Sequence, residues 1–329
     1  MVIHSIPAGS LRRSEKVVQE FNGSQRRVAA IFPPEIGKLA VVTASTGGIG
    51  FEIARALAQA GADVIVTGRH SADGYEALAK IRPVAPQALV RFEKLDMESQ
   101  ASVADFAKRL CSVGRPIDLL INNASTLVLL KRAVTVDGFE VHLATNFLSH
   151  FALTAHLMPL LRTAKKPRVV QLTSTGRHHG EISLDDLQLE RGYTPLKAYS
   201  QSKLAMLIFA IELQRQSDRQ GWGLVGNSAQ PIGARAALLA NATEVTGSMG
   251  WYRRALGVMP EPPQGSDVQA PLDTSDQEEQ GDPTTAKSLA DLIGPTVPEA
   301  LDMRTLDPEM GRKLWDVATV LTKVEWPNQ

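Results

Sequence analysis

The sequence has little of what marks secreted, membrane-spanning or nucleic-acid-binding proteins. Cys111 is the only cysteine among 329 residues, which excludes intrachain disulfides and cysteine-based metal clusters and favours a reducing, cytoplasmic setting. Lys and Arg number 35, as do Asp and Glu, so no basic excess is available for a nucleic-acid partner. No apolar run reaches the roughly 18 residues of a membrane span. We therefore expect a soluble protein that is not exported and has no membrane span.

Between Lys38 and Leu213, short β-branched runs alternate with longer helical patterns, which is typical of βαβ units and a parallel sheet. The strand-like runs are residues 39–43, 63–67, 89–95, 117–122, 168–174 and 223–229. The helical patterns include residues 50–60, 99–111, 139–161 and 198–216. The predicted fold class is α/β, a Rossmann-type doubly wound parallel sheet in a single domain.

The two ends of the chain extend this domain. Residues 1–37 are interpreted as an N-terminal arm before the Rossmann domain of residues 38–329. Residues 236–300 are interpreted as a variable substrate loop with an acidic insertion, because residues 260–286 hold seven carboxylates, five prolines and no Lys or Arg. Residues 305–323 predict a terminal amphipathic helix. The residues of this helix that are available for packing are Leu314, Trp315, Val317, Ala318 and Leu321.

The string TASTGGIG, Thr43 to Gly50, follows a predicted strand and opens a predicted helix. In that context a glycine-rich turn favours a dinucleotide site: Gly48 would let the backbone approach the pyrophosphate, and the helix N-terminus would supply free N–H groups. Gly50 would let the helix and the strand pack closely. Ala44 stands where a glycine is usual. A tight turn without a ligand is the alternative.

The second predicted strand ends VIVTGRH, without the acidic residue that binds the ribose 2′-hydroxyl of NAD. It offers Arg69 instead, and a guanidinium suits the 2′-phosphate of NADP. A solvated loop arginine would look the same. Asp96, in KLDM at the end of the third strand, is in position to contact the adenine, although a polar strand end without a ligand would read alike.

Tyr199 and Lys203, in YSQSK, lie four residues apart on one face of a predicted helix. A nearby ammonium stabilises a phenolate, so we expect Lys203 to lower the pKa of Tyr199 and let it exchange a proton near neutral pH. Alone, this pair also fits a half-exposed helix face. Ser174 and the string NNAS, Asn122 to Ser125, follow neighbouring strands at the sheet edge where α/β proteins bind ligands.

Asn146, in ATNFLSHF, interrupts an apolar helix, where an amide is costly unless it is hydrogen-bonded. A satisfied structural amide is the alternative to a functional role. His178 and His179 have no metal-ligand spacing around them, and we predict no metal site.

Together these residues resemble the short-chain dehydrogenase/reductase family and, more narrowly, its retinol-dehydrogenase-like branch. The resemblance spans most of residues 35–240 and rests on TASTGGIG, NNAS, TNFLSHF, the stretch TSTGRHHGEISLDDLQLERGYTPLKAYSQSKLA and the weaker AQPIGARAALLAN. It implies hydride transfer between a nicotinamide and a carbonyl carbon, but it does not imply a retinoid. The catalytic tetrad that it implies is Asn146, Ser174, Tyr199 and Lys203.

The resemblance also implies a role for each member of the tetrad. Tyr199 would exchange the proton and Ser174 would hydrogen-bond the substrate oxygen. Lys203 would assist Tyr199 and hold the nicotinamide ribose, and Asn146 would anchor a water that links Lys203 to solvent. The predicted cofactor-binding residues are Thr43, Ser45, Thr46, Gly48, Ile49, Gly50, Arg69, Asp96, Met97, Asn123, Ala124, Tyr199, Lys203, Pro231 and Ile232.

The turn after the sixth strand departs from the family pattern of His-Pro-Gly followed by a threonine. It reads AQPIGARAAL, with Gln230 for the histidine, Ile232 for the glycine and Ala236 for the threonine. A β-branched residue replaces a permissive one there, so we expect a shifted or loosened nicotinamide. The apolar residues that follow would form a lid over a lipophilic substrate or close the core. They are Met249, Trp251, Tyr252, Leu256 and Met259.

These observations lead to two hypotheses from different classes. The first is an NADP(H)-dependent oxidoreductase that interconverts a carbonyl and an alcohol on a mostly apolar small molecule. The second is a dinucleotide-binding protein that has lost hydride transfer and acts as a sensor or scaffold, which the altered turn motivates and the complete tetrad opposes. Helices that are apolar nearly all round, at residues 147–161 and 204–211, fit either a homodimer interface or a thicker monomeric core.

Overall fold

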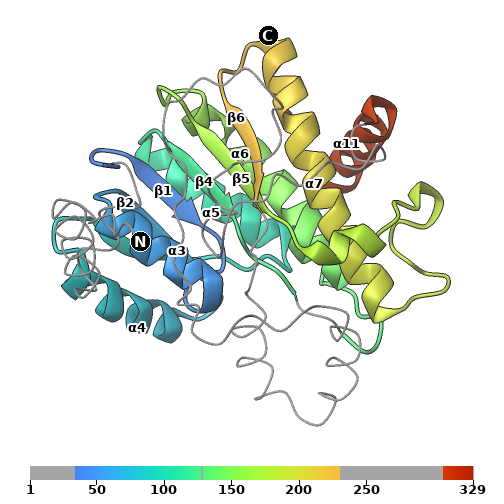
Figure 1. Cartoon of the computed structure of the whole chain (residues 1–329), viewed down its shortest axis with the longest axis horizontal. Helices are drawn as coiled ribbons and strands as arrows, with labels where there is room; N and C mark the ends of the chain where they lie inside the picture. The colour runs from blue at the N-terminus through green and yellow to red at the C-terminus, as the bar shows by residue number, and fades with distance from the viewer. Residues whose placement is uncertain (1–33, 127–128, 230–306, 329) are drawn as a thin grey trace, which may run out of the picture.

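The computed structural model describes residues 34–126, 129–229 and 307–328, and their centre is a parallel sheet of six strands. The strand order is β3-β2-β1-β4-β5-β6 (Figure 1). The chain builds outward from β1 to β3 and then crosses back to β4, so the order reverses between β1 and β4. This confirms the doubly wound Rossmann-type sheet. The strands are β1 (Leu39–Val42), β2 (Asp63–Gly68), β3 (Val90–Lys94), β4 (Leu119–Asn122), β5 (Arg168–Leu172) and β6 (Val225–Ala229).

Helices cover both faces of the sheet (Figure 1). The α-helices are α3 (Gly48–Gln59), α4 (Ser71–Ile81), α5 (Gln100–Val113), α6 (Ser149–Leu161), α7 (Pro195–Gln220) and α11 (Pro308–Thr322). A π-helical segment, η2 (Leu143–Leu148), precedes α6. Short 3₁₀ turns are η1 (Arg82–Val84), η3 (Thr175–His179) and η4 (Leu184–Asp186).

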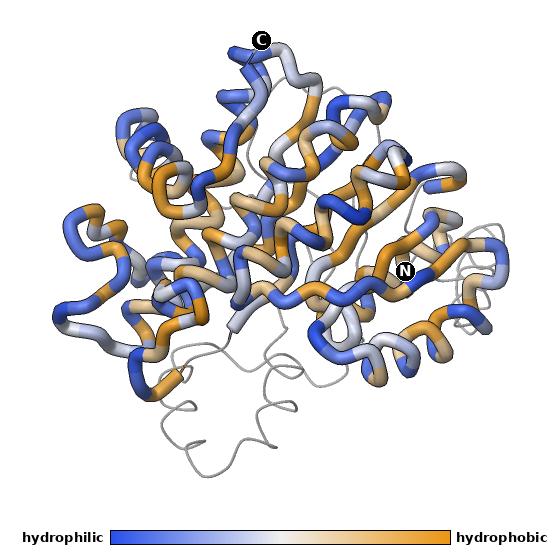
Figure 2. The backbone as a smooth tube through the Cα atoms, turned by 180° about the vertical axis from the view of Figure 1, so that it is seen from behind, coloured by the Kyte–Doolittle hydropathy of each residue, from blue (hydrophilic) through white to orange (hydrophobic). Residues whose placement is uncertain are grey.

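Successive side chains of a strand point to opposite faces of the sheet, and they pack into two separate hydrophobic cores. Along β1, Ala40 and Val42 pack with α3 and α4, whereas Leu39 and Val41 pack with α5, α6 and α7. Both faces of β1 are therefore buried, which explains why this strand, LAVV, is apolar without a break. Figure 2 shows the same arrangement as orange central strands inside helices that are banded blue and orange.

The predicted strands are confirmed to within two residues at each end. The prediction did not single out α4, and α7 starts earlier than expected because Thr194 caps it and Pro195 occupies its first position. The helical pattern predicted over residues 139–161 is confirmed for residues 141–161, although the helix is not regular throughout. Within η2 the backbone widens, so that the Ser149 N–H donates to the Ala144 carbonyl five residues back. Asn146 lies inside this widened segment. Single π-helical turns within α-helices occur frequently at functional sites.

The terminal helix α11 is confirmed, and it lies beside α7 and α6 (Figure 1). Trp315 of α11 contacts the Phe151 ring of α6, with 5.0 Å between the ring centres, and Trp326, which follows α11, lies 4.3 Å from Trp315. The Trp222 indole N–H donates to the Pro327 carbonyl at 3.1 Å. The C-terminal segment thus covers part of the apolar surface of α6 and α7. The homodimer remains a prediction.

Several expectations fall on residues outside the described ranges. These are most of the arm, Pro231 and Ile232, Ala236, and the loop of residues 236–300. Within the ranges that are described, no helix is both long and apolar enough to cross a membrane. The same ranges hold no group of three or more His, Cys, Asp or Glu side chains that could bind a metal ion.

Trp315→Ala tests whether the C-terminal helix stabilises the fold. Trp315 is 9% exposed, and truncating a buried aromatic side chain typically costs about 3–5 kcal/mol. We expect a loss of this order in the free energy of unfolding, measured by urea denaturation. Val320→Ala on the same helix is the matched control: Val320 is 74% exposed, so its truncation should change stability by at most about 0.5 kcal/mol. Equal effects of the two substitutions would contradict a packing role for α11.

Candidate active site

The turn between β1 and α3 is fixed by polar side chains. The Ser45 hydroxyl donates to the Val42 carbonyl at 2.7 Å and accepts from the Thr67 N–H at 2.9 Å, which ties the turn to β2. Ala44 has a φ of 50°, a left-handed conformation that favours glycine. The departure noted at Ala44 is therefore accommodated by local backbone strain, held in place by the contacts on either side.

The start of α3 has the features that a pyrophosphate needs. Gly47, its N-cap, supplies no side-chain cap, and the first turn holds no acidic residue. A Cβ at Gly47 would meet nothing within 4 Å, so this backbone is open to a ligand. Gly48 has a φ of +57°, and a Cβ at Gly50 would lie 2.4 Å from the Ala44 carbonyl oxygen and from Asn123 Nδ2. The residues present therefore fit a dinucleotide phosphate at this helix N-terminus.

The end of β2 presents Arg69, whose guanidinium pairs with Glu98 at 3.2 Å. Both side chains are exposed, at 58% and 37%, so the pair is open to exchange for another anion. Asp96 accepts from the Glu98 N–H at 3.0 Å and so caps its own turn. The buried Met97 offers its carbonyl to the Ser149 hydroxyl at 2.7 Å. Thr46 packs against Gly68 of β2: a Cβ added at Gly68 would lie 2.7 Å from the Thr46 methyl group.

Tyr199, Lys203 and Ser174 converge at the carboxyl end of β5. Ser174 follows β5 as the N-cap of η3, and its hydroxyl accepts from the N–H of Gly176, which lies against the Tyr199 ring. Lys203 is 3% exposed, donates to the Leu172 carbonyl at 3.1 Å and places Nζ 5.9 Å from the centre of the Tyr199 ring. A Cβ at Gly176 would lie 3.0 Å from that ring, so a glycine leaves the space for it.

Burial dominates the proton chemistry of this pair. It raises the pKa of Tyr199, against a lowering by the Ser174 hydrogen bond, and it lowers the pKa of Lys203 to about 8. The expectation that Lys203 lowers the pKa of Tyr199 is not met, because the net shift of that pKa is upward. The physical reason is that both groups leave water together, and desolvation favours the neutral form of each.

Asn146 is fully buried, with both ends of its side chain engaged. Its Oδ1 accepts from the Thr126 N–H at 2.7 Å, and its Nδ2 donates to the Ser202 hydroxyl at 2.9 Å. Ser202 in turn donates to the Tyr199 carbonyl at 2.7 Å. Asn146 therefore links the segment after β4 to the helical turn that carries Tyr199, and the costly buried amide is satisfied.

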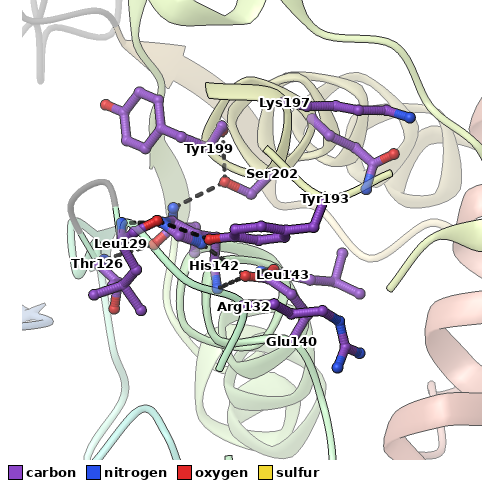
Figure 3. A network of polar contacts seen from close by, with 12 residues as sticks. Thr126, Leu129, Arg132, Glu140, His142, Leu143, Tyr193, Lys197, Tyr199 and Ser202 are labelled. Carbon is purple, nitrogen blue, oxygen red and sulfur yellow. Dashed lines mark hydrogen bonds and ion pairs between the residues drawn. The ribbon is translucent and has the colours of Figure 1, made fainter. Parts of the chain in front are cut away.

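A second anchor is His142, four residues before Asn146, which contacts the chain after β4 at Leu129. Leu129 donates its N–H to Nε2 of the buried His142 at 3.3 Å and accepts from the Tyr193 hydroxyl at 2.9 Å (Figure 3). His142 Nδ1 contacts the Glu140 carboxylate at 2.7 Å, and that carboxylate also accepts from the Leu143 N–H. Burial, reinforced by Glu140, raises the pKa of Tyr193 to about 12, which keeps its hydroxyl a donor.

A third anchor is made by Thr43, which connects the dinucleotide turn to the start of the same segment. Its hydroxyl accepts from the N–H groups of Asn123 and Ala124, both at 2.8 Å, and lies 2.9 Å from His150 Nε2. The side-chain amide of Asn123 donates in turn to the carbonyl oxygens of Thr43 and Ala44, at 2.8 and 3.1 Å. The dinucleotide turn and the chain after β4 are thus one hydrogen-bonded unit.

The structure brings the sequence-predicted residues together in two adjoining groups. Thr43, Ser45, Gly48, Ile49, Gly50, Asn123 and Ala124 lie around the start of α3, and Asn146, Ser174, Tyr199 and Lys203 lie where β4 and β5 end. The sequence interpretation missed His142, His150 and Tyr193. The signal that singled out Asn146, a polar group inside an apolar helix, was present for both histidines as well.

Comparisons with known proteins identify the family of this chain. The model of the short chain dehydrogenase family matches residues 38–244. Polyprenol dehydrogenase of Mus musculus is 42% identical over 205 residues, which cover 61% of each chain, and human retinol dehydrogenase 12 is 36% identical over 207 residues, covering 63% of this chain and 65% of its own. The match thus spans less than two thirds of these relatives.

Among solved structures, an uncharacterised protein from Mycobacterium paratuberculosis superposes with a TM-score of 0.68. It is 32% identical, and the match covers 91% of this chain and 98% of that protein. The family match includes all six strands and all four residues of the implied tetrad. The chain therefore belongs to the short-chain dehydrogenase/reductase family of oxidoreductases, in its retinol-dehydrogenase-like branch.

Proposed function

We propose that this protein is an NADP(H)-dependent oxidoreductase that interconverts a carbonyl and an alcohol on a mostly apolar small molecule. The observation that carries the proposal is the convergence of Tyr199, Ser174 and the buried Lys203 beside an uncapped helix N-terminus. One edge of the sheet thus offers a proton donor, a hydroxyl for the substrate oxygen and a cradle for a dinucleotide.

The residues around α3 would hold the dinucleotide. The N–H groups at the start of the helix would bind the pyrophosphate, and Arg69 would exchange its exposed partner Glu98 for the 2′-phosphate. When bound, the cofactor supplies or accepts the hydride. Lys203, next to the reacting edge, would hold the nicotinamide ribose.

The proton would pass through Tyr199. Its raised pKa keeps the phenol protonated, so that in the direction of reduction it can donate to the carbonyl oxygen as negative charge develops there. Ser174, at the end of β5, would hydrogen-bond and orient the same oxygen. Asn146 would act through its own backbone carbonyl oxygen, which would accept from a water that leads from Lys203 toward solvent.

The substrate class rests on the relatives' names and on composition. Polyprenol and retinol, in those names, are apolar alcohols, which supports an apolar alcohol or aldehyde here. The rival function, a sensor or scaffold without hydride transfer, depends on Ile232 and Ala236, which lie outside the described residues. The complete tetrad favours catalysis.

Tyr199→Phe removes the proposed proton donor and keeps the packing of the ring. We expect turnover to fall at least about a hundredfold while NADPH binding persists. The measurement is a steady-state assay with NADPH against a panel of apolar aldehydes and ketones, with binding followed by titration calorimetry. Wild-type rates in the variant would contradict the role of Tyr199. A wild-type protein that binds NADPH but reduces nothing in the panel would favour the scaffold function.

Arg69→Ala tests the choice of cofactor. If Arg69 binds the 2′-phosphate, the variant should bind NADPH about tenfold or more weakly and NADH unchanged, since charge-assisted hydrogen bonds contribute about 1.5–3 kcal/mol. Glu98→Gln is the matched variant: it releases the guanidinium from its partner, so NADPH should bind a few-fold more tightly. Titration calorimetry measures both. Equal affinities of the wild-type protein for NADPH and NADH would contradict the assignment.

A further inference from the structure

His150 is a fully buried imidazole to which the reaction chemistry assigns no role. It lies in α6, four residues after Asn146, where its Nδ1 is 2.9 Å from the Asn146 carbonyl oxygen. Its Nε2 is 2.9 Å from the Thr43 hydroxyl. One side chain therefore touches both the helical turn of the tetrad and the turn of the dinucleotide site.

The partners of His150 fix its tautomer. A carbonyl oxygen only accepts, so Nδ1 must carry the proton and Nε2 must present its lone pair to Thr43. Burial, with a further contribution from Lys203, lowers the pKa of His150 to about 3 against the raising effect of the Asn146 hydrogen bond. The imidazole is therefore neutral at any pH used for assay, and it neither donates a proton to the reaction nor senses pH near neutrality.

The tautomer of His150 in turn fixes the Thr43 hydroxyl. That hydroxyl has one proton, which goes to His150 at 2.9 Å rather than to the Ile121 carbonyl at 3.3 Å. Its two lone pairs then face the N–H groups of Asn123 and Ala124. All the hydrogen-bonding capacity of this buried hydroxyl is used, and its orientation follows from the position of the imidazole.

We infer that His150 is a positioning residue that couples the two halves of the active site. Through Nε2 it orients Thr43 and with it the backbone of Asn123 and Ala124, beside the predicted cofactor. Through Nδ1 it holds the carbonyl of Asn146 within the widened turn of η2. The inference rests on the proposed function, because the two halves are assigned to cofactor binding and to proton delivery.

Two substitutions separate the two contacts. An asparagine side chain places its amide N–H near the position of the histidine Nδ1, so His150→Asn keeps the donor to Asn146 and loses the acceptor for Thr43. A glutamine side chain reaches the position of Nε2 with its oxygen, so His150→Gln keeps the acceptor and loses the donor. His150→Phe fills the space and loses both. His156, half-buried on the same helix, is the matched control site for the same three substitutions.

The expected result is a split between binding and turnover. His150→Asn should raise the Kd for NADPH about fivefold and leave kcat at saturating NADPH within about threefold, as expected for the loss of one neutral hydrogen bond at the cofactor side. His150→Gln should leave Kd within about threefold and lower kcat about tenfold, because small displacements of catalytic groups are costly. His150→Phe should show both effects, and the His156 variants neither.

Amide hydrogen exchange of the NADPH-free protein gives a readout that needs no turnover. His150→Asn should speed exchange in peptides covering Asn123 and Ala124, and His150→Gln in peptides covering residues 143–149. Identical behaviour of the Asn and Gln variants, or a Phe variant with wild-type Kd, kcat and exchange, would overturn the inference and leave His150 as core packing. If the wild-type protein turns over no carbonyl, the proposed function fails, and the Kd and exchange measurements still test the coupling.

Discussion

The active site depends on the requirement that buried polar groups be hydrogen-bonded. His142, Asn146 and His150 follow one another at intervals of four residues along η2 and α6, and all three are shielded from water. Each costs free energy unless it finds a partner. His142 and Asn146 find theirs in the chain after β4, and His150 finds Thr43, whose hydroxyl contacts that chain. One helix therefore anchors the described residues after β4 at Asn123 and Ala124, at Thr126 and at Leu129.

The sheet supplies the fixed frame for these anchors. Because parallel strands end at the same edge, the turns after β1, β4 and β5 meet there, and the reversal of strand order between β1 and β4 leaves room beside them for a ligand. The two buried cores hold the strands in register from both faces. On the outer side of α6 and α7, the aromatic cluster around Trp315 buries the surface opposite the sheet, so the helix that carries His150 is packed on two sides.

Burial also determines the proton affinities of the site. Desolvation moves Tyr199, Lys203 and His150 toward their neutral forms, although one is an acid and two are bases. For Tyr199 this means a retained proton, which suits a donor to a carbonyl oxygen. For His150 it means a single neutral tautomer, which suits a structural connection. Desolvation therefore suits Tyr199 to proton donation and His150 to a fixed hydrogen-bonding role.

The sequence by itself determined the strand-helix alternation and the glycine-rich turn between β1 and α3, because each is a local pattern: apolar periodicity, and glycines between a strand and a helix. It indicated the four residues of the tetrad through the family resemblance. Tertiary structure decided the rest. The pairing of Arg69 with Glu98 and the anchoring contacts of His142, His150 and Tyr193 depend on partners between 13 and 107 residues away. The widening of η2 around Asn146 was not visible in the apolar periodicity either. A single polar side chain in an apolar helix indicates that it needs a partner, but only the folded chain decides which partner lies within reach and which nitrogen of an imidazole carries the proton.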